Sequence, residues 1–171
     1  MKLILKNIEL SFLSTEKKYF YDLIKDIDEF GGGYYPTKAG EETTRSGNII
    51  KTSLESLPLN FQLEHGHTYL IGAKISTPYS SIRTTNAYNY NGVDFSGGYS
   101  INTPFIAIVT DSDSTKEFTK FPYLTLFHQD HSTTRSTEYE VYLYDITGEE
   151  TSKFESMTFD DLRTGKISVN V

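Results

Sequence analysis

The sequence contains no cysteine and no tryptophan. The absence of cysteine excludes disulfide bonds, cysteine-ligated zinc sites and thiol nucleophiles. Aromatic area comes instead from 13 tyrosines and 11 phenylalanines, and each contributes a large apolar surface when it is buried. This aromatic, β-branched and Thr/Ser-rich composition favours β-sheet. At 171 residues the chain has the length of a single domain, residues 1–171, and its core needs no disulfide or metal.

Basic residues and long apolar runs are also scarce. Lysine and arginine number 16 against 23 acidic residues, which gives a formal net charge of -7. Because binding to a phosphate backbone requires clustered basic side chains, and these are scattered here, we expect no nucleic-acid partner. Residues 1–13 are interrupted by Lys6, Asn7 and Glu9, and no apolar run approaches the length of a membrane span. We therefore expect a soluble protein without a signal peptide, transmembrane segment or membrane partner.

Residues 61–76 give the clearest pattern in the chain. Phe61 and Leu63 alternate with polar residues, a break follows around Gly66, and alternation then resumes from Tyr69 to Ile75. Period-two patterning on both sides of a short glycine-containing break predicts a β-hairpin with one buried face, at the middle of a sheet.

One helix is expected near the N-terminus, at about residues 15–30. Ser14 or Thr15 offers an N-cap, and three glycines at 31–33 offer a stop. The apolar residues between them fall at helical spacing: Phe20, Leu23, Ile24, Ile27 and Phe30.

The remaining chain alternates strand-like runs with polar loops. Two long loops are expected, at about 31–48 and 77–103, and part of the second, around 81–90, reads as a strand. Roughly eight to ten strands with one helix predict a mostly-β, antiparallel, jelly-roll-like β-sandwich. Besides the central hairpin, the expected strands are 2–12, 49–54, 105–109, 123–127, 139–146, 154–162 and 166–171.

Two segments resemble those of jelly-roll carbohydrate-binding modules. Within residues 57–76, the run Gly66-His67-Thr68-Tyr69 is similar to a G-x-T-Y turn that enters a strand ending in Ala-Lys. Residues 157–162, MTFDDL, are similar to the aromatic-Asp-Asp-aliphatic strand that closes such modules. The resemblance implies a jelly-roll architecture and transfers no binding residue.

The histidines form two pairs, His65 with His67 and His128 with His131. Residues two apart on a strand share a face, so two such pairs on neighbouring strands would make a metal site. Gly66 favours the alternative, in which His65 and His67 are solvated residues of a turn.

A second candidate metal site is a calcium loop. Asp111 and Asp113 offer oxygen ligands at alternate positions, but the glycine and glutamate of an EF-hand are missing. A polar turn is the competing interpretation, and we favour no metal at either site.

Catalytic motifs are lacking. Ser14 to Lys17 matches S-x-x-K, but capping of the predicted helix explains it. No nucleophile elbow, P-loop or dinucleotide fingerprint is present, so the sequence predicts neither an enzyme nor a cofactor.

The segment from residue 79 to 99 has the composition of a binding loop, since tyrosine gives rigid contact area and Asn, Ser and Gly give adaptable hydrogen bonds. Packing of these aromatic side chains on the sandwich is the alternative. The candidate residues for binding a protein or a glycan are Tyr79, Arg83, Tyr88, Tyr90, Phe95 and Tyr99.

These observations favour a non-catalytic structural or assembly protein that acts through protein–protein contacts or self-assembly. An auxiliary or decoration component of a phage virion is one such role, since the chain is acidic, lacks cysteine, begins in a predicted strand without a leader and has long irregular loops. A carbohydrate-binding module or adhesin domain is the first alternative, and a metal-dependent jelly-roll enzyme is the second.

Overall fold

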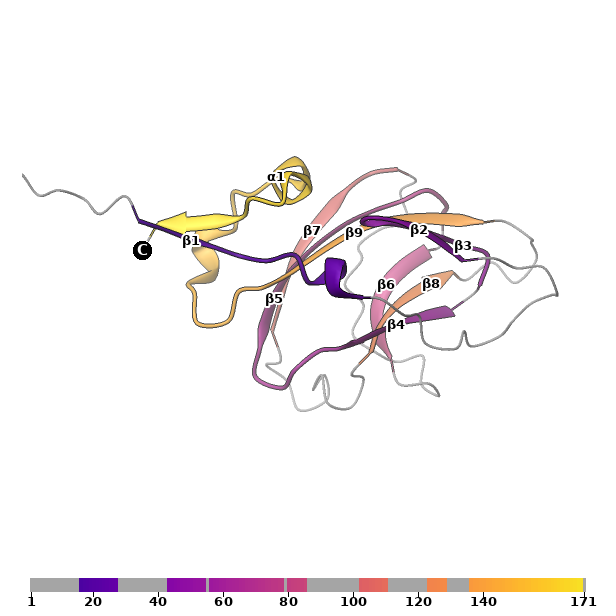
Figure 1. Cartoon of the computed structure of the whole chain (residues 1–171), viewed down its shortest axis with the longest axis horizontal. Coiled ribbons are helices and arrows are strands. Elements are labelled where there is room, and N and C mark those ends of the chain that lie inside the picture. The colour runs from indigo at the N-terminus through magenta and orange to yellow at the C-terminus, as the bar shows by residue number, and fades with distance from the viewer. Residues whose placement is uncertain are drawn as a thin grey trace, which may run out of the picture.

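The computed structural model describes residues 16–27, 43–54, 56–78, 80–85, 102–110, 123–128 and 136–170. Within these ranges most residues lie in strands (Figure 1). The elements, in chain order, are β1 (Lys17–Tyr19), the 3-10 helix η1 (Leu23–Asp26), β2 (Thr44–Ser46), β3 (Ile49–Thr52), β4 (Ser56–Gln62), β5 (Thr68–Ile75), β6 (Ser80–Thr85), β7 (Phe105–Thr110), β8 (Tyr123–His128), β9 (Thr137–Asp145), the 3-10 helix η3 (Thr151–Lys153), α1 (Phe159–Thr164) and β10 (Ser168–Asn170).

The strands form three antiparallel sheets. A five-stranded sheet has the order β2-β3-β9-β5-β7, and a three-stranded sheet has the order β4-β8-β6. The remaining two strands, β1 and β10, pair with each other as a ribbon at one end of the molecule (Figure 1). The predicted mostly-β, antiparallel sandwich is thus confirmed.

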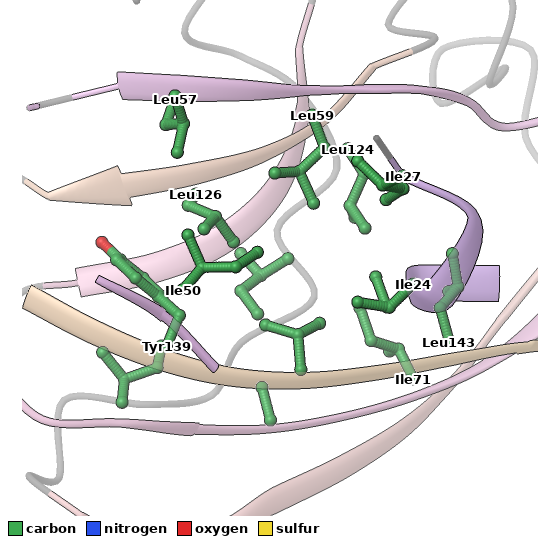
Figure 2. Packing of buried hydrophobic residues seen from close by; sticks show 14 of the residues in the cluster. Ile24, Ile27, Ile50, Leu57, Leu59, Ile71, Leu124, Leu126, Tyr139 and Leu143 are labelled. Carbon is green, nitrogen blue, oxygen red and sulfur yellow. The ribbon is translucent and has the colours of Figure 1, made fainter. Parts of the chain in front are cut away.

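The main core lies between the two larger sheets (Figure 2). Successive residues of a strand point to opposite faces. Tyr139, Val141 and Leu143 of β9 therefore share the face that meets Leu124 and Leu126 of β8. Period-two patterning along the strands produces this core.

A second core covers the opposite face of the five-stranded sheet. Tyr142 and Tyr144, which alternate with the residues above, pack here with Leu70 of β5. The C-terminal segment supplies Phe154 and Leu162, both fully buried. The central strand β5 of this sheet is consequently buried on both faces, which explains its nearly continuous apolar run.

The expected central hairpin is wrong. β4 pairs with β8, whereas β5 pairs with β7 and β9, so the two strands belong to different sheets. Gly66, at φ +78°, lies in the turn between them. Leu63 and Tyr69 both contribute to the main core, one from each side of that turn. Alternation specifies which face is buried but does not specify the pairing partner.

The helix predicted at about residues 15–30 is also wrong. Lys17–Tyr19 is strand β1, and the only helical turn in the described part of this range is η1. Phe20 packs in the second core, while Ile24 and Ile27 pack in the main core. The apolar spacing that resembled one helical face thus serves two separate cores.

The α-helix of the described residues, α1, lies near the C-terminus, in the segment 154–162 that was predicted as a strand. Thr158 caps it, because its hydroxyl accepts from the Asp161 backbone N–H while the Asp161 carboxylate accepts from the Thr158 backbone N–H. Gly165, at φ +67°, ends the helix in the left-handed conformation that glycine favours.

Other strand predictions agree with the structure. The ranges 49–54 and 166–171 contain β3 and β10, and the ranges 105–109, 123–127 and 139–146 overlap most of β7, β8 and β9. Both expected long loops contain a strand, β2 in the first and β6 in the second. The strand expected at 2–12 lies outside the described residues.

Tyr139 links the two larger sheets, because its hydroxyl donates to the Phe127 carbonyl oxygen of β8 at 2.9 Å. Burial raises the pKa of this phenol, so it remains a donor at neutral pH. We expect Tyr139→Phe to lower the free energy of unfolding by about 1 kcal/mol, the net value of one hydrogen bond, in urea denaturation. Tyr19→Phe, at an exposed position, is the matched control, and an equal loss in both variants would contradict the link.

Candidate contact surface on the β1–β10 ribbon

From Tyr19, the last residue of β1, to Asp22, exposed and buried side chains alternate along the chain. Phe20 packs against Phe154 at a ring-centroid distance of 5.4 Å, and Asp22 is only 2% exposed. Tyr19, which precedes Phe20, is 66% exposed, and Tyr21, which lies between Phe20 and Asp22, is 57% exposed. An extended chain whose inner residues are anchored therefore presents two tyrosines to solvent.

Asp22 fixes this segment against β9. Its Oδ1 accepts from the backbone N–H groups of Ile24 and Leu143, each at 3.2 Å. Its Oδ2 accepts from the side-chain amide of Asn48 at 2.6 Å, and that amide also donates to the Val141 carbonyl oxygen. Asp22, the residue next to Tyr21, is thus held by one local hydrogen bond from Ile24 and by two from Asn48 and Leu143, which are distant in sequence.

Tyr21 is itself oriented by its neighbours. Its hydroxyl donates to the Asp26 carboxylate at 2.9 Å, and the Lys25 ammonium lies 6.0 Å from its ring centroid. The hydrogen bond to Asp26 raises the pKa of the Tyr21 hydroxyl, so the phenol is neutral at physiological pH. A fixed, neutral aromatic ring loses little side-chain entropy when another surface covers it.

The outward face of the ribbon also carries polar side chains. Lys17 is paired in register with Asn170, and Tyr19 with Ser168, and residues directly opposite on an antiparallel pair share a face. A pocket of about 310 Å³ opens here. It is lined by Lys17, Lys153, Ser168, Val169 and Asn170.

Two lysines share one carboxylate next to this pocket, and a third, Lys17, lines the pocket. Glu149 accepts from Lys18 at 2.7 Å and from Lys153 at 3.0 Å. The hydrogen bond from Lys18, followed by that from Lys153, lowers the pKa of the Glu149 carboxyl group. Lys17 forms no ion pair with the described residues, so the four side chains carry a surplus of positive charge.

Of the binding residues predicted from the sequence, the structure describes Arg83. Its guanidinium lies 3.8 Å from the Phe127 ring centroid, and its Nη2 donates to the Ser81 hydroxyl at 2.8 Å. Arg83 therefore stacks on the three-stranded sheet and is partly buried. The other candidates lie outside the described residues: Tyr79, Tyr88, Tyr90, Phe95 and Tyr99.

The histidine pairs do not form a metal centre within the part of the chain that the structure describes. His67 lies in the turn before β5, with its Nδ1 2.6 Å from an Asp145 carboxylate oxygen, and His65 is an exposed residue of the same turn. His128 is buried on β8, with Nδ1 2.9 Å from the Ser80 hydroxyl. No group of three or more His, Cys, Asp or Glu among these residues could hold a metal ion.

The remaining candidate ligands, His131, Asp111 and Asp113, lie outside the described residues. Within those residues, no helix is long and apolar enough to cross a bilayer.

Sequence reasoning missed Tyr19 and Tyr21 because it placed them on a helix. A signal was present nonetheless. Lys17, Tyr19 and Tyr21 alternate with Lys18, Phe20 and Asp22, and tyrosine and phenylalanine favour strands. Which of two neighbouring side chains is exposed, however, depends on contacts with β9 and β10, and the local sequence does not reveal these contacts.

No protein-family model and no curated protein matches the chain. Among solved structures, the chain is similar to a point mutant of a carbohydrate binding module of family 29, with TM-score 0.43 and 11% identity over 76% of this chain and 92% of that one. A second point mutant, of a module studied for ligand recognition in the same family, gives TM-score 0.41 and 12% identity over 76% and 86%. These structures belong to the class of module that the sequence resembles.

Proposed function

We propose that this chain is a non-catalytic assembly protein that binds a second copy of itself through the outward face of the β1–β10 ribbon. The exposure of Tyr19 and Tyr21 on one anchored segment, at the end of β1 and just after it, carries the proposal. Large exposed aromatic side chains that lie close together mark contact surfaces, because each buries a large apolar area at low entropic cost.

The ribbon also offers backbone groups for association. Among the described strands, β1 pairs with β10 alone, so one edge of β1 has no strand partner there. An unpaired edge presents N–H and C=O groups that accept an added strand from another chain. Tyrosine contacts and strand pairing would act at the same place.

Charge supports a second copy as the partner. The chain has a formal net charge of -7, whereas the lysine cluster beside the ribbon carries excess positive charge. A cationic patch on an acidic protein favours head-to-tail contact with an acidic surface of another copy, and such a contact weakens as salt screens it.

Sedimentation velocity on the purified chain tests the proposal. We expect the sedimentation coefficient to rise with protein concentration, and the double variant Tyr19→Ser/Tyr21→Ser to weaken association by about tenfold or more, since buried tyrosines dominate contact energies. Ile49→Ser, which alters the exposed Ile49 of β3, is the matched control and should associate as the wild type does.

Two outcomes would overturn the proposal. The first is a wild-type chain that sediments as a monomer over the whole concentration range. The second is a glycan-array result in which the wild type binds one sugar class and the double variant does not. The tyrosine face would then be a stacking surface for sugar rings, and the chain a carbohydrate-binding module.

A further inference from the structure

We infer that the pocket beside β10 binds a carboxylate group. The inference rests on the proposed function and names the chemistry of the contact, an acidic side chain of the second copy. The lining of the pocket contains two lysines, one serine and one asparagine, and no acidic residue. Ammonium, hydroxyl and amide groups all donate hydrogen bonds, so the pocket is built of donors suited to an anion.

The positive charge of the pocket is incompletely neutralised. Glu149 is shared between Lys18 and Lys153, and three lysines less one glutamate leave a surplus of two charges when Lys17 is included. Lys153 uses one of its three N–H donors on Glu149 and retains the others. An entering carboxylate would receive hydrogen bonds from Lys17 and Lys153 together.

The position of the pocket couples it to the tyrosines. Lys17, Ser168 and Asn170 line the pocket and lie on the ribbon face that carries Tyr19. A partner whose apolar surface covers Tyr19 therefore brings its neighbouring side chains over the pocket. The pocket volume of about 310 Å³ accommodates an acidic side chain with part of its backbone. The tyrosines would supply contact area, and the lysines would select an acidic residue beside it.

Amide chemical shifts of the ¹⁵N-labelled full chain, titrated at low salt with a capped triglutamate peptide, test the pocket. We expect saturable shifts at Ser168 to Asn170, and at least about tenfold weaker binding by Lys17→Gln, because one of the two lining charges is lost. Lys51→Gln makes the same charge change on β3, away from the pocket lining, and should bind as the wild type does. A capped triglutamine peptide should produce no shifts.

Three results would overturn the inference: no saturable shift at β10, equal weakening by Lys17→Gln and Lys51→Gln, or tighter binding of inorganic phosphate than of triglutamate. Because Lys17 is exposed, the melting temperature of Lys17→Gln should equal that of the wild type, which keeps a binding loss interpretable. If the chain is monomeric but binds triglutamate, carboxylate binding by the pocket is supported and association with a second copy is refuted. If the chain associates but does not bind triglutamate, association with a second copy is supported and carboxylate binding by the pocket is refuted.

Discussion

Replacing Asp22 with alanine is expected to lower the free energy of unfolding by roughly 3 to 5 kcal/mol, because loss of the Asp22 carboxylate leaves several buried polar groups without their hydrogen-bond acceptor. The Asp22 carboxylate is 2% exposed and accepts hydrogen bonds from Ile24, Leu143 and Asn48. Alanine removes both carboxylate oxygens and therefore all three hydrogen bonds. The backbone N–H groups of Ile24 and Leu143 would then remain away from water without this partner.

A graded series separates the hydrogen bonds from the side-chain volume. Asp22→Asn keeps one oxygen that can accept the two backbone N–H groups, but it places an amide N–H₂ opposite the Asn48 amide. We therefore expect Asp22→Asn to cost less than Asp22→Ala in urea denaturation. Asp160→Asn is the matched control, because Asp160 is highly exposed on α1. Similar losses for Asp22→Ala and Asp160→Asn would refute an anchoring role for Asp22.

The second large effect is expected at Gly72 on β5, where Leu162 and Phe159 of α1 pack against the strand. A Cβ atom at Gly72 would clash with Leu162 Cδ2 and would lie 3.4 Å from Phe159 Cδ2. Leu162 is fully buried in the second core, so it cannot move away without disturbing its neighbours. We expect Gly72→Ala to lower the free energy of unfolding by about 1 to 3 kcal/mol through overpacking.

A double-mutant cycle with Leu162→Ala tests this packing directly. Leu162→Ala alone should cost about 2 to 5 kcal/mol, because it leaves a cavity in the second core. In the double variant, the new methyl group at position 72 enters that cavity, so Gly72→Ala should cost little or should stabilise the chain. Additive losses in the cycle would show that the Gly72 effect does not arise from contact with Leu162.

How far the sequence predicts this fold depends on the range of the interactions that determine each element. β9 was predicted at 139–146, where aromatic and aliphatic residues fall within one short run. In the structure these residues pack into the two cores, one on each face of the strand. β4 and β5 were also predicted as strands, but their assignment to separate sheets was not. That assignment depends on pairing with β8 and β9, which lie more than fifty residues later.

The two ends of the chain were misread for a related reason. At the C-terminal end, the spacing of Thr158 and Asp161 followed by Gly165 is a capping signal that local reasoning could have used to predict α1. At the N-terminal end, β1 exists only because Lys17–Tyr19 pairs with Ser168–Asn170, at the opposite end of the described chain. No local pattern specifies that pairing.

The candidate contact surface follows from the same long-range pairing. Tyr19 and Tyr21 are exposed because Phe20 and Asp22 are anchored to the second core and to β9. The sequence also favoured tyrosine-mediated contact, but it located that contact at 79–99. Except for residues 80–85, that segment lies outside the described residues, so its role stays a prediction.

The most direct test of the contact surface is a comparison of ¹⁵N–¹H amide spectra of the wild-type chain at low and high protein concentration. If the ribbon binds a second copy, concentration-dependent shifts will concentrate at residues 17–21 and 168–170, together with the acidic surface that they meet. Spectra that do not change with concentration, or changes that leave residues 17–21 and 168–170 unaffected, would contradict the proposed role of the ribbon.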